Sequence, residues 1–236
     1  MFSSAGTKTV LLEVRDSGGL TNNTTKQVEV ITASPGETGT VTDIDGNVYK
    51  TVKIGNQWWM AENLKVTRFN NGDSIPIVSD DVAWTNTGIA YCIYDNDTRN
   101  IDNYGFLYKF WALNHNNRTI APQGWHIPTN NDWQTLVDYL GGEAIAGSSM
   151  KEEGTVHWAE PNEGATNSSG FTALPGGYRK YTGAFGSINT RAYFWSSEMR
   201  DIYTALYQTL HTINASILLG NTIDPGYGFS VRCVKD

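Results

Sequence analysis

The sequence predicts an α+β fold, in which two helices near the front are followed by antiparallel strands. Apolar residues recur at helical spacing in two segments, 104–115 and 128–142. Short alternating segments, separated by loops rich in Gly, Asn, Ser and Thr, occupy most of the rest. With 236 residues, of which 39% are hydrophobic, the chain can bury a full core in one or two domains.

The first segment is typical of a β-hairpin. Residues 8–15 and 24–31 alternate apolar and polar side chains, and a loop with Asp16 and two glycines joins them. Because an isolated hairpin is marginally stable, it needs further strands. The pattern resembles the last two strands of a bacterial PKD or other immunoglobulin-like domain, so residues 1–32 are expected to be the C-terminal hairpin of such a sandwich. The alternative is that the hairpin is the first piece of the main domain.

A short linker is expected at residues 33–40, which hold Pro35 and two glycines without apolar periodicity. The main domain then runs over 41–236. It opens on a hairpin whose strands turn at Gly55-Asn56 and return through two adjacent tryptophans. Because side chains alternate along a strand, we expect Trp59 to be buried and Trp58 to face the surface, where it could contact the amino-terminal hairpin or a domain before it.

Two helices follow in the prediction. The first has an apolar stripe at Leu107, Phe110 and Trp111, so Trp111 is expected in the core. The second repeats the spacing from Trp133 to Leu140, with Thr129 as its N-cap and two glycines at its end. Beyond residue 142 the sequence favours short antiparallel strands and long loops.

Composition and charge exclude several classes of function. The net charge is −7, and no Lys/Arg run exceeds a dipeptide, so nucleic-acid binding has no electrostatic support. No apolar run is long enough to span a bilayer. The start has neither the basic end nor the apolar run of a signal peptide, which together with the hairpin favours a fragment of a longer extracellular protein.

Residues that could support catalysis or redox chemistry are sparse. The four histidines form no i, i+4 zinc pair, and no G-x-S-x-G motif is present. Four glutamates between 152 and 163 could offer paired carboxylates, but solvated loop carboxylates are the better interpretation. Cys92 and Cys233 lie in apparent apolar strands, where they form either one disulfide or two buried thiols. We therefore expect no enzyme.

Six blocks in order carry a resemblance to a known family. They are "DIDGNVYKTVKIGNQWWMAENL", "YCIYDND…YGFLYKFWAL", "APQGWHIPTNNDW", "SSGFTALPGGYR", "YFWSSE" and "SVRCVKD". Together they resemble the Fibrobacter succinogenes major paralogous domain, a family of surface and secreted proteins common in Bacteroidetes and Fibrobacteres. The resemblance implies a C-type-lectin-like fold, an extracellular or cell-surface location with its signal or lipid anchor outside this stretch, and binding or adhesion. An enzyme on a formylglycine-generating-like scaffold ranks third.

The resemblance to lectins raises the question of calcium, which lectins hold with carboxylate and amide oxygens. The lectin Glu-Pro-Asn triplet has a near match at Glu160, Asn162 and Glu163, which are the candidate metal ligands. Three Asp/Asn-rich stretches, at 43–47, 95–97 and 130–132, are equally well explained as turns or a helix start. No cofactor other than calcium is expected.

Aromatic side chains supply the candidate ligand site. Twelve tyrosines and eight tryptophans exceed the needs of one core, and a stacking platform suits a glycan. The expected function is non-catalytic recognition of a glycan or cell-surface protein, and the alternative is a structural stalk or tip module whose aromatics pack against neighbouring domains. The candidates in polar loop contexts are Trp84, Trp158, Tyr178, Tyr181 and Tyr227.

Overall fold

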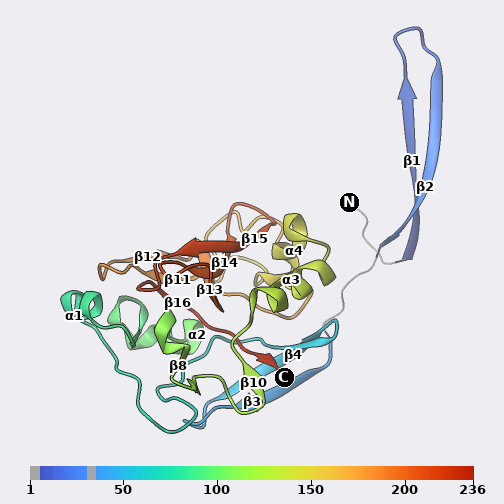
Figure 1. Cartoon of the computed structure of the whole chain (residues 1–236). Coiled ribbons are helices and arrows are strands. Elements are labelled where there is room, and N and C mark those ends of the chain that lie inside the picture. Colours follow the sequence, from blue (N-terminus) through green and yellow to red (C-terminus); the bar gives the residue numbers. More distant parts are fainter. Residues whose placement is uncertain (1–5, 31–35) are drawn as a thin grey trace. The chain divides into compact units, whose positions relative to one another are not determined.

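The computed structural model describes residues 6–30 and 36–236, which form two separate units (Figure 1). The first is a single antiparallel hairpin of β1 (Gly6–Arg15) and β2 (Thr21–Val30). Its tight turn follows from Asp16, whose side chain accepts hydrogen bonds from the amides of Gly18 and Leu20, both at 2.9 Å. The hairpin expected from the sequence is confirmed, although β2 begins three residues earlier and Ile31 lies outside the described residues.

The second unit opens on a five-stranded antiparallel sheet in the order β10-β17-β5-β4-β3, so strands from its two ends meet in one sheet. Strand β3 begins at Thr38 and pairs with β4. Residues 38–40 therefore belong to the domain, and the linker expected at 33–40 is too long at that end. The strands are β3 (Thr38–Thr42), β4 (Val48–Ile54), β5 (Gln57–Met60), β10 (Trp125–His126) and β17 (Val234–Lys235).

A second five-stranded sheet has the order β12-β11-β16-β7-β6, and a three-stranded sheet has the order β13-β14-β15. A small pair, β8 with β9, completes the strands. Their bounds are β6 (Tyr91–Cys92), β7 (Leu107–Lys109), β8 (Asn114–His115), β9 (Arg118–Thr119), β11 (Gly176–Arg179), β12 (Phe185–Ile188), β13 (Arg191–Met199), β14 (Ala205–His211), β15 (Ile217–Ile223) and β16 (Gly228–Phe229).

One of the two predicted helices is confirmed. Helix α3 (Asn130–Tyr139) begins with a capping box, in which Thr129 and Asp132 bond to each other's backbone amides. Within the described ranges, no helix is long and apolar enough to cross a membrane. The other helices are α1 (Asp81–Asn86), α2 (Ile101–Tyr104), α4 (Glu143–Met150) and the short 3-10 turns η1 (Tyr94–Asn96), η2 (Thr98–Asn100) and η3 (Phe110–Ala112).

The helix predicted across residues 107–114 is wrong, because this segment is strand β7, turn η3 and strand β8. Leu107 and Tyr108 point to opposite faces of β7 and enter two different core clusters. A strand that is buried on both faces has a continuous apolar sequence, which also fits a helical stripe. Trp111, expected in the core, is instead 40% exposed.

Two large core clusters lie on the two faces of the first sheet. Trp59 is fully buried in the cluster beneath α3, whereas Met60 enters the other cluster. The burial expected for Trp59 is thus confirmed. Trp58 is partly exposed, and its ring reaches across β4 to lie near Gly39 of β3. In Figure 1, α3 and α4 lie beside the β13-β14-β15 sheet, which separates them from the β11 sheet.

Buried cations hold the long loops of this domain in place. The ammonium of Lys151 donates to the carbonyls of Glu163, His211 and Asn214. Arg232 is likewise buried and donates to the carbonyls of Met60, Phe171 and Thr172 and to the side chain of Asn63. Because each cation satisfies several carbonyls at once, segments without regular structure remain packed.

Candidate ligand-binding site

Three of the five aromatic candidates meet at one surface. Tyr178 lies on β11, Tyr181 follows β11 in the turn to β12, and Tyr227 directly precedes β16. The ring centroids of Tyr181 and Tyr227 are 5.8 Å apart, and those of Tyr227 and Tyr178 are also 5.8 Å apart. Strand β11 pairs with β16, so the sheet itself brings these residues together.

Further aromatic residues, which were not among the candidates from the sequence, extend this group. The ring of Tyr193, on β13, is 5.4 Å from Tyr178, and Tyr207, on β14, is 5.9 Å from Tyr193. Phe229 lies beneath, within 5.8 Å of Tyr193, Tyr207 and Tyr227. We call the tyrosines of this group, 178, 181, 193, 207 and 227, the tyrosine cluster.

The tyrosine cluster combines a buried floor with exposed rings. Tyr193 and Phe229 are buried, Tyr178, Tyr207 and Tyr227 are partly exposed, and Tyr181 is 41% exposed. Among the described residues, the hydroxyls of Tyr178, Tyr181, Tyr207 and Tyr227 have no hydrogen-bond partner. Each can therefore donate to, or accept from, a ligand.

Burial and neighbouring phenols keep the hydroxyls of Tyr207 and Tyr227 protonated at neutral pH. Burial raises the pKa of Tyr227, and the neighbouring phenols of Tyr178 and Tyr181 raise it further. Burial also raises the pKa of Tyr207, with a smaller contribution from Tyr193. An ordinary tyrosine pKa is already near 10, so a raised value leaves the hydroxyl as a neutral donor and acceptor.

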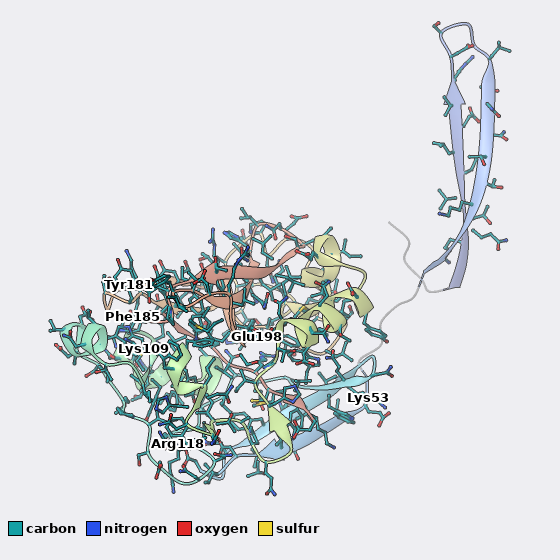
Figure 2. All side chains as sticks on the ribbon, in the orientation of Figure 1. Lys53, Lys109, Arg118, Tyr181, Phe185 and Glu198 are labelled. Carbon is teal, nitrogen blue, oxygen red and sulfur yellow. The ribbon has the colours of Figure 1, made fainter. Side chains whose placement is uncertain are left out.

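Trp84, a surface candidate from the sequence, is instead fully buried and supports the cluster from below. Its indole N–H donates to the carbonyl of Lys180 at 3.0 Å, and the hydroxyl of Thr85 donates to the carbonyl of Tyr181 at 3.3 Å. Helix α1 therefore fixes the turn that presents Tyr181. Figure 2 shows Tyr181 and Phe185 at this end of the domain, close to α1.

Buried Arg179 holds the same turn from the strand side. Its guanidinium donates to the carbonyls of Gly183, Val78 and Ser79 and pairs with Asp81 at 2.8 Å. It also lies over the Trp84 ring, 4.6 Å from the centroid. The turn from β11 to β12 is thus tied to α1 by one cation and one indole.

A glycine sets the position of Tyr178. Gly186 lies directly opposite Tyr178 in the β11–β12 pair. A Cβ atom at residue 186 would be only 2.8 Å from the phenol oxygen of Tyr178. The tyrosine ring therefore lies across the strand over the bare glycine backbone, and any larger residue at 186 would displace it.

Trp158 is not a surface residue either, because it is 1% exposed and belongs to the core cluster beneath α3. Its indole N–H donates to the carbonyl of Ala173 at 2.9 Å. The ammonium of Lys151 lies 5.6 Å from the ring centroid. Polar flanking residues suggested exposure from the sequence, but the loop around Trp158 packs its indole into the core cluster beneath α3.

Of the three residues proposed as calcium ligands, Asn162 holds a loop together. The side-chain amide of Asn162, which is buried, donates to the carbonyls of Glu152 and Gly154 at 2.8 and 2.6 Å. Glu160 and Glu163 are exposed. Across residues 6–30 and 36–236, no three His, Cys, Asp or Glu side chains converge in a geometry suited to a metal ion.

The two cysteines are free thiols, so the alternative of a disulfide between Cys92 and Cys233 is not what the structure contains. They are buried in different core clusters. Burial raises the pKa of Cys92 to about 12 and also raises that of Cys233. Both thiols are therefore protonated and inert at neutral pH, unlike the reactive pair that formylglycine-type oxidation requires.

A separate hollow of about 250 Å³ lies beside the turn after β3. It is lined by Asp43 and Ile44 on one side and by residues 120–123 on the other. The carboxylate of Asp43 is already occupied, because it accepts from the hydroxyl of Tyr49 at 2.6 Å and from nearby amides. The carboxylate of Asp43 is therefore not free to bind a ligand in this hollow.

The fold and the cluster define an α+β domain, mostly of antiparallel sheets, that presents grouped aromatic side chains at its surface. The chain belongs to the Fibrobacter succinogenes major domain family, which it matches over residues 52–235. Comparison with curated proteins and with solved structures finds no match.

Proposed function

We propose that this chain is a non-catalytic glycan-binding module of a secreted or surface-attached bacterial protein, and that the tyrosine cluster is its binding surface. The observation that carries the proposal is the group of Tyr178, Tyr181 and Tyr227, whose rings are each partly or well exposed and whose hydroxyls have no hydrogen-bond partner among the described residues. Sugars present apolar C–H faces edged by hydroxyls. A row of phenols matches both features, because the rings stack and the hydroxyls exchange hydrogen bonds.

The supporting turn favours recognition over a passive surface role. Trp84, Arg179 and α1 fix the turn that bears Tyr181, so little side-chain and loop freedom would be lost on binding. Exposure of several aromatic rings to water is unfavourable, and such exposed apolar patches usually mark a binding site. A bound ligand would cover the rings.

We further propose that the domain is a distant form of the C-type-lectin-like fold. Three features support this: α3 and α4 pack against antiparallel strands, strands from both ends of the domain share one sheet, and residues 152–172 form a long loop before the last strands. An extracellular or cell-surface location follows from the same proposal.

The alternative is a structural module of a multidomain surface protein. One observation favours a structural role for the amino-terminal unit. Val10, Leu12 and Val14 share one face of β1, and all three are exposed. A PKD or other immunoglobulin-like sandwich would cover this face with its remaining strands. The tyrosine cluster, which belongs to the other unit, is the part that distinguishes the two functions.

A glycan array with the full chain tests the proposal. We expect binding to a subset of glycans, lost in Tyr227→Ala and reduced in Tyr181→Ala. Tyr139→Ala is the matched control, because Tyr139 is an exposed tyrosine on α3 outside the cluster. No binding to plant or host glycans, or equal loss in the control, would refute the assignment and favour the structural alternative.

A further inference from the structure

Two basic side chains flank the tyrosine cluster, one at each end. Lys180 directly precedes Tyr181, and its ammonium lies 5.5 Å from the centroid of that ring. Arg191 begins β13 at the other end, with its Nη1 atom 3.4 Å from the hydroxyl of Tyr193. The two cations thus lie at opposite ends of the aromatic chain that runs through Tyr227, Tyr178 and Tyr193.

Neither cation has an acidic partner within the described ranges of the chain. The buried cations nearby differ, since Arg179 pairs with Asp81 and Lys109 donates to the carbonyls of Trp84 and Thr87. Arg191 is exposed and Lys180 partly exposed, so both can reach a bound molecule. Their charges are therefore available to a ligand.

The residues around Arg191 also leave its positive charge available to a ligand. On the neighbouring strand β14, His211 lies opposite Arg191. Burial lowers the pKa of His211, and the charges of Arg191 and Lys151 lower it further, so His211 is neutral at pH 7. Arg191 also partly offsets the raised pKa of Tyr207. Among the described residues no carboxylate forms an ion pair with Arg191, so this end of the cluster carries an unpaired positive charge.

One carboxylate lies on the same surface. Asp224 is exposed next to Tyr227, and its Oδ1 atom accepts a hydrogen bond from the amide of Gly226 at 2.7 Å. The charge of Asp224 acts on Tyr227, so an anionic ligand would have to place its acidic groups toward Lys180 and Arg191 and its hydroxyls toward Asp224. That pattern suits a sugar chain with acidic residues spaced along it.

We propose that the ligand is an acidic glycan, whose carboxylate groups pair with Arg191 and Lys180 while its sugar rings stack on the tyrosines. This rests on the proposed glycan-binding function and narrows it to one class of ligand. Arginine binds a carboxylate in a bidentate manner, whereas lysine contributes a point charge, so Arg191 is expected to contribute more to selectivity.

The test uses the full chain with two matched polymers. Polygalacturonate supplies a carboxylate on every sugar, and its fully methyl-esterified form supplies the same sugars without charge. We expect the acidic polymer to bind at least tenfold more tightly at low salt, and Arg191→Gln to reduce its binding about three- to tenfold. Arg200→Gln, an exposed arginine in the β13–β14 turn, is the control and should change little.

The possible results distinguish a failure of the acidic preference from a failure of glycan binding itself. If both polymers bind equally and Arg191→Gln has no effect, the acidic preference is wrong while glycan binding stands. If neither polymer nor any array glycan binds, the proposed function itself fails. Dextran sulfate tests simple ion exchange: binding to it that matches polygalacturonate and survives Tyr227→Ala would overturn the inference, because stacking would then contribute nothing.

Discussion

Replacement of the buried Lys151 by methionine tests how the long loop of residues 152–172 is held. Methionine has a similar length and fills most of the same space, but it has no donors. The ammonium of Lys151 donates at 2.9, 3.1 and 2.8 Å to the carbonyls of Glu163, His211 and Asn214. The variant leaves these carbonyls without their shared partner in a buried site.

The expected loss of stability follows from the three carbonyl acceptors that lose the ammonium group. Each buried acceptor left unpaired costs about 1–3 kcal/mol, and relief of the buried charge offsets part of the total. We therefore expect Lys151→Met to lower the free energy of unfolding by about 3–5 kcal/mol, a large fraction of the roughly 5–15 kcal/mol typical of a domain. Urea unfolding followed by tryptophan fluorescence measures it. Lys50→Met, an exposed strand lysine, should change the same quantity by less than about 0.5 kcal/mol.

The same residue gives a pH dependence with a definite sign. Burial lowers the pKa of Lys151 to about 8 from an ordinary value near 10.5, although Glu163 acts in the opposite direction. Below pH 8 the lysine is charged in both states, and the cost of burying the charge is fully present. Between about pH 8 and 10.5 the unfolded state binds more protons, so this residue adds stability as the pH rises. The difference in stability between the native chain and Lys151→Met should therefore grow over this range.

A loss below about 1 kcal/mol for Lys151→Met would refute the reasoning, because the carbonyls would then have found other partners. A stability difference from the native chain that shrinks between pH 8 and 10 would separately refute the lowered pKa of Lys151. Both measurements compare variants under identical conditions, so titration of tyrosines and cysteines elsewhere cancels.

Three further predictions concern other parts of the chain. The thiols of Cys92 and Cys233 should not react with a thiol reagent at pH 8 in the native protein and should both react in denaturant; fast native labelling would contradict their burial. Thr129→Ala should lower the free energy of unfolding by about 1 kcal/mol through loss of the α3 cap, whereas Thr135→Ala, in the same helix, should cost less; equal losses would argue against the capping box. Gly186→Ala should displace Tyr178 and weaken glycan binding with little change in melting temperature, and unchanged binding would exclude Tyr178 from the site.

Local sequence signals predicted the elements whose structure depends on near neighbours. Helix α3 follows from an apolar stripe and a cap that lie within one stretch, and the β1–β2 hairpin follows from alternation around one turn. Such signals do not depend on the rest of the chain. The burial of Trp59 was predictable for the same reason, since alternation alone separates it from Trp58.

Elements that depend on distant partners were not predictable. Strand β7 pairs with β6 and β16 along its edges, and two core clusters cover its two faces. Its sequence is therefore continuously apolar and resembles a helical stripe. Trp84 and Trp158 lie in polar stretches, but backbone carbonyls from remote segments accept their indole N–H groups. Tyr193 and Tyr207 were missed because only the pairing of β13 with β14 places them beside Tyr178.

A crystal structure of the full chain soaked with the tightest-binding array oligosaccharide tests the proposed function most directly. We expect the sugar on the surface formed by Tyr178, Tyr181 and Tyr227, with at least one ring stacked and a tyrosine hydroxyl within hydrogen-bond distance. Sugar bound instead in the hollow lined by Asp43, Ile44 and residues 120–123, with the tyrosines uncovered, would contradict the assignment.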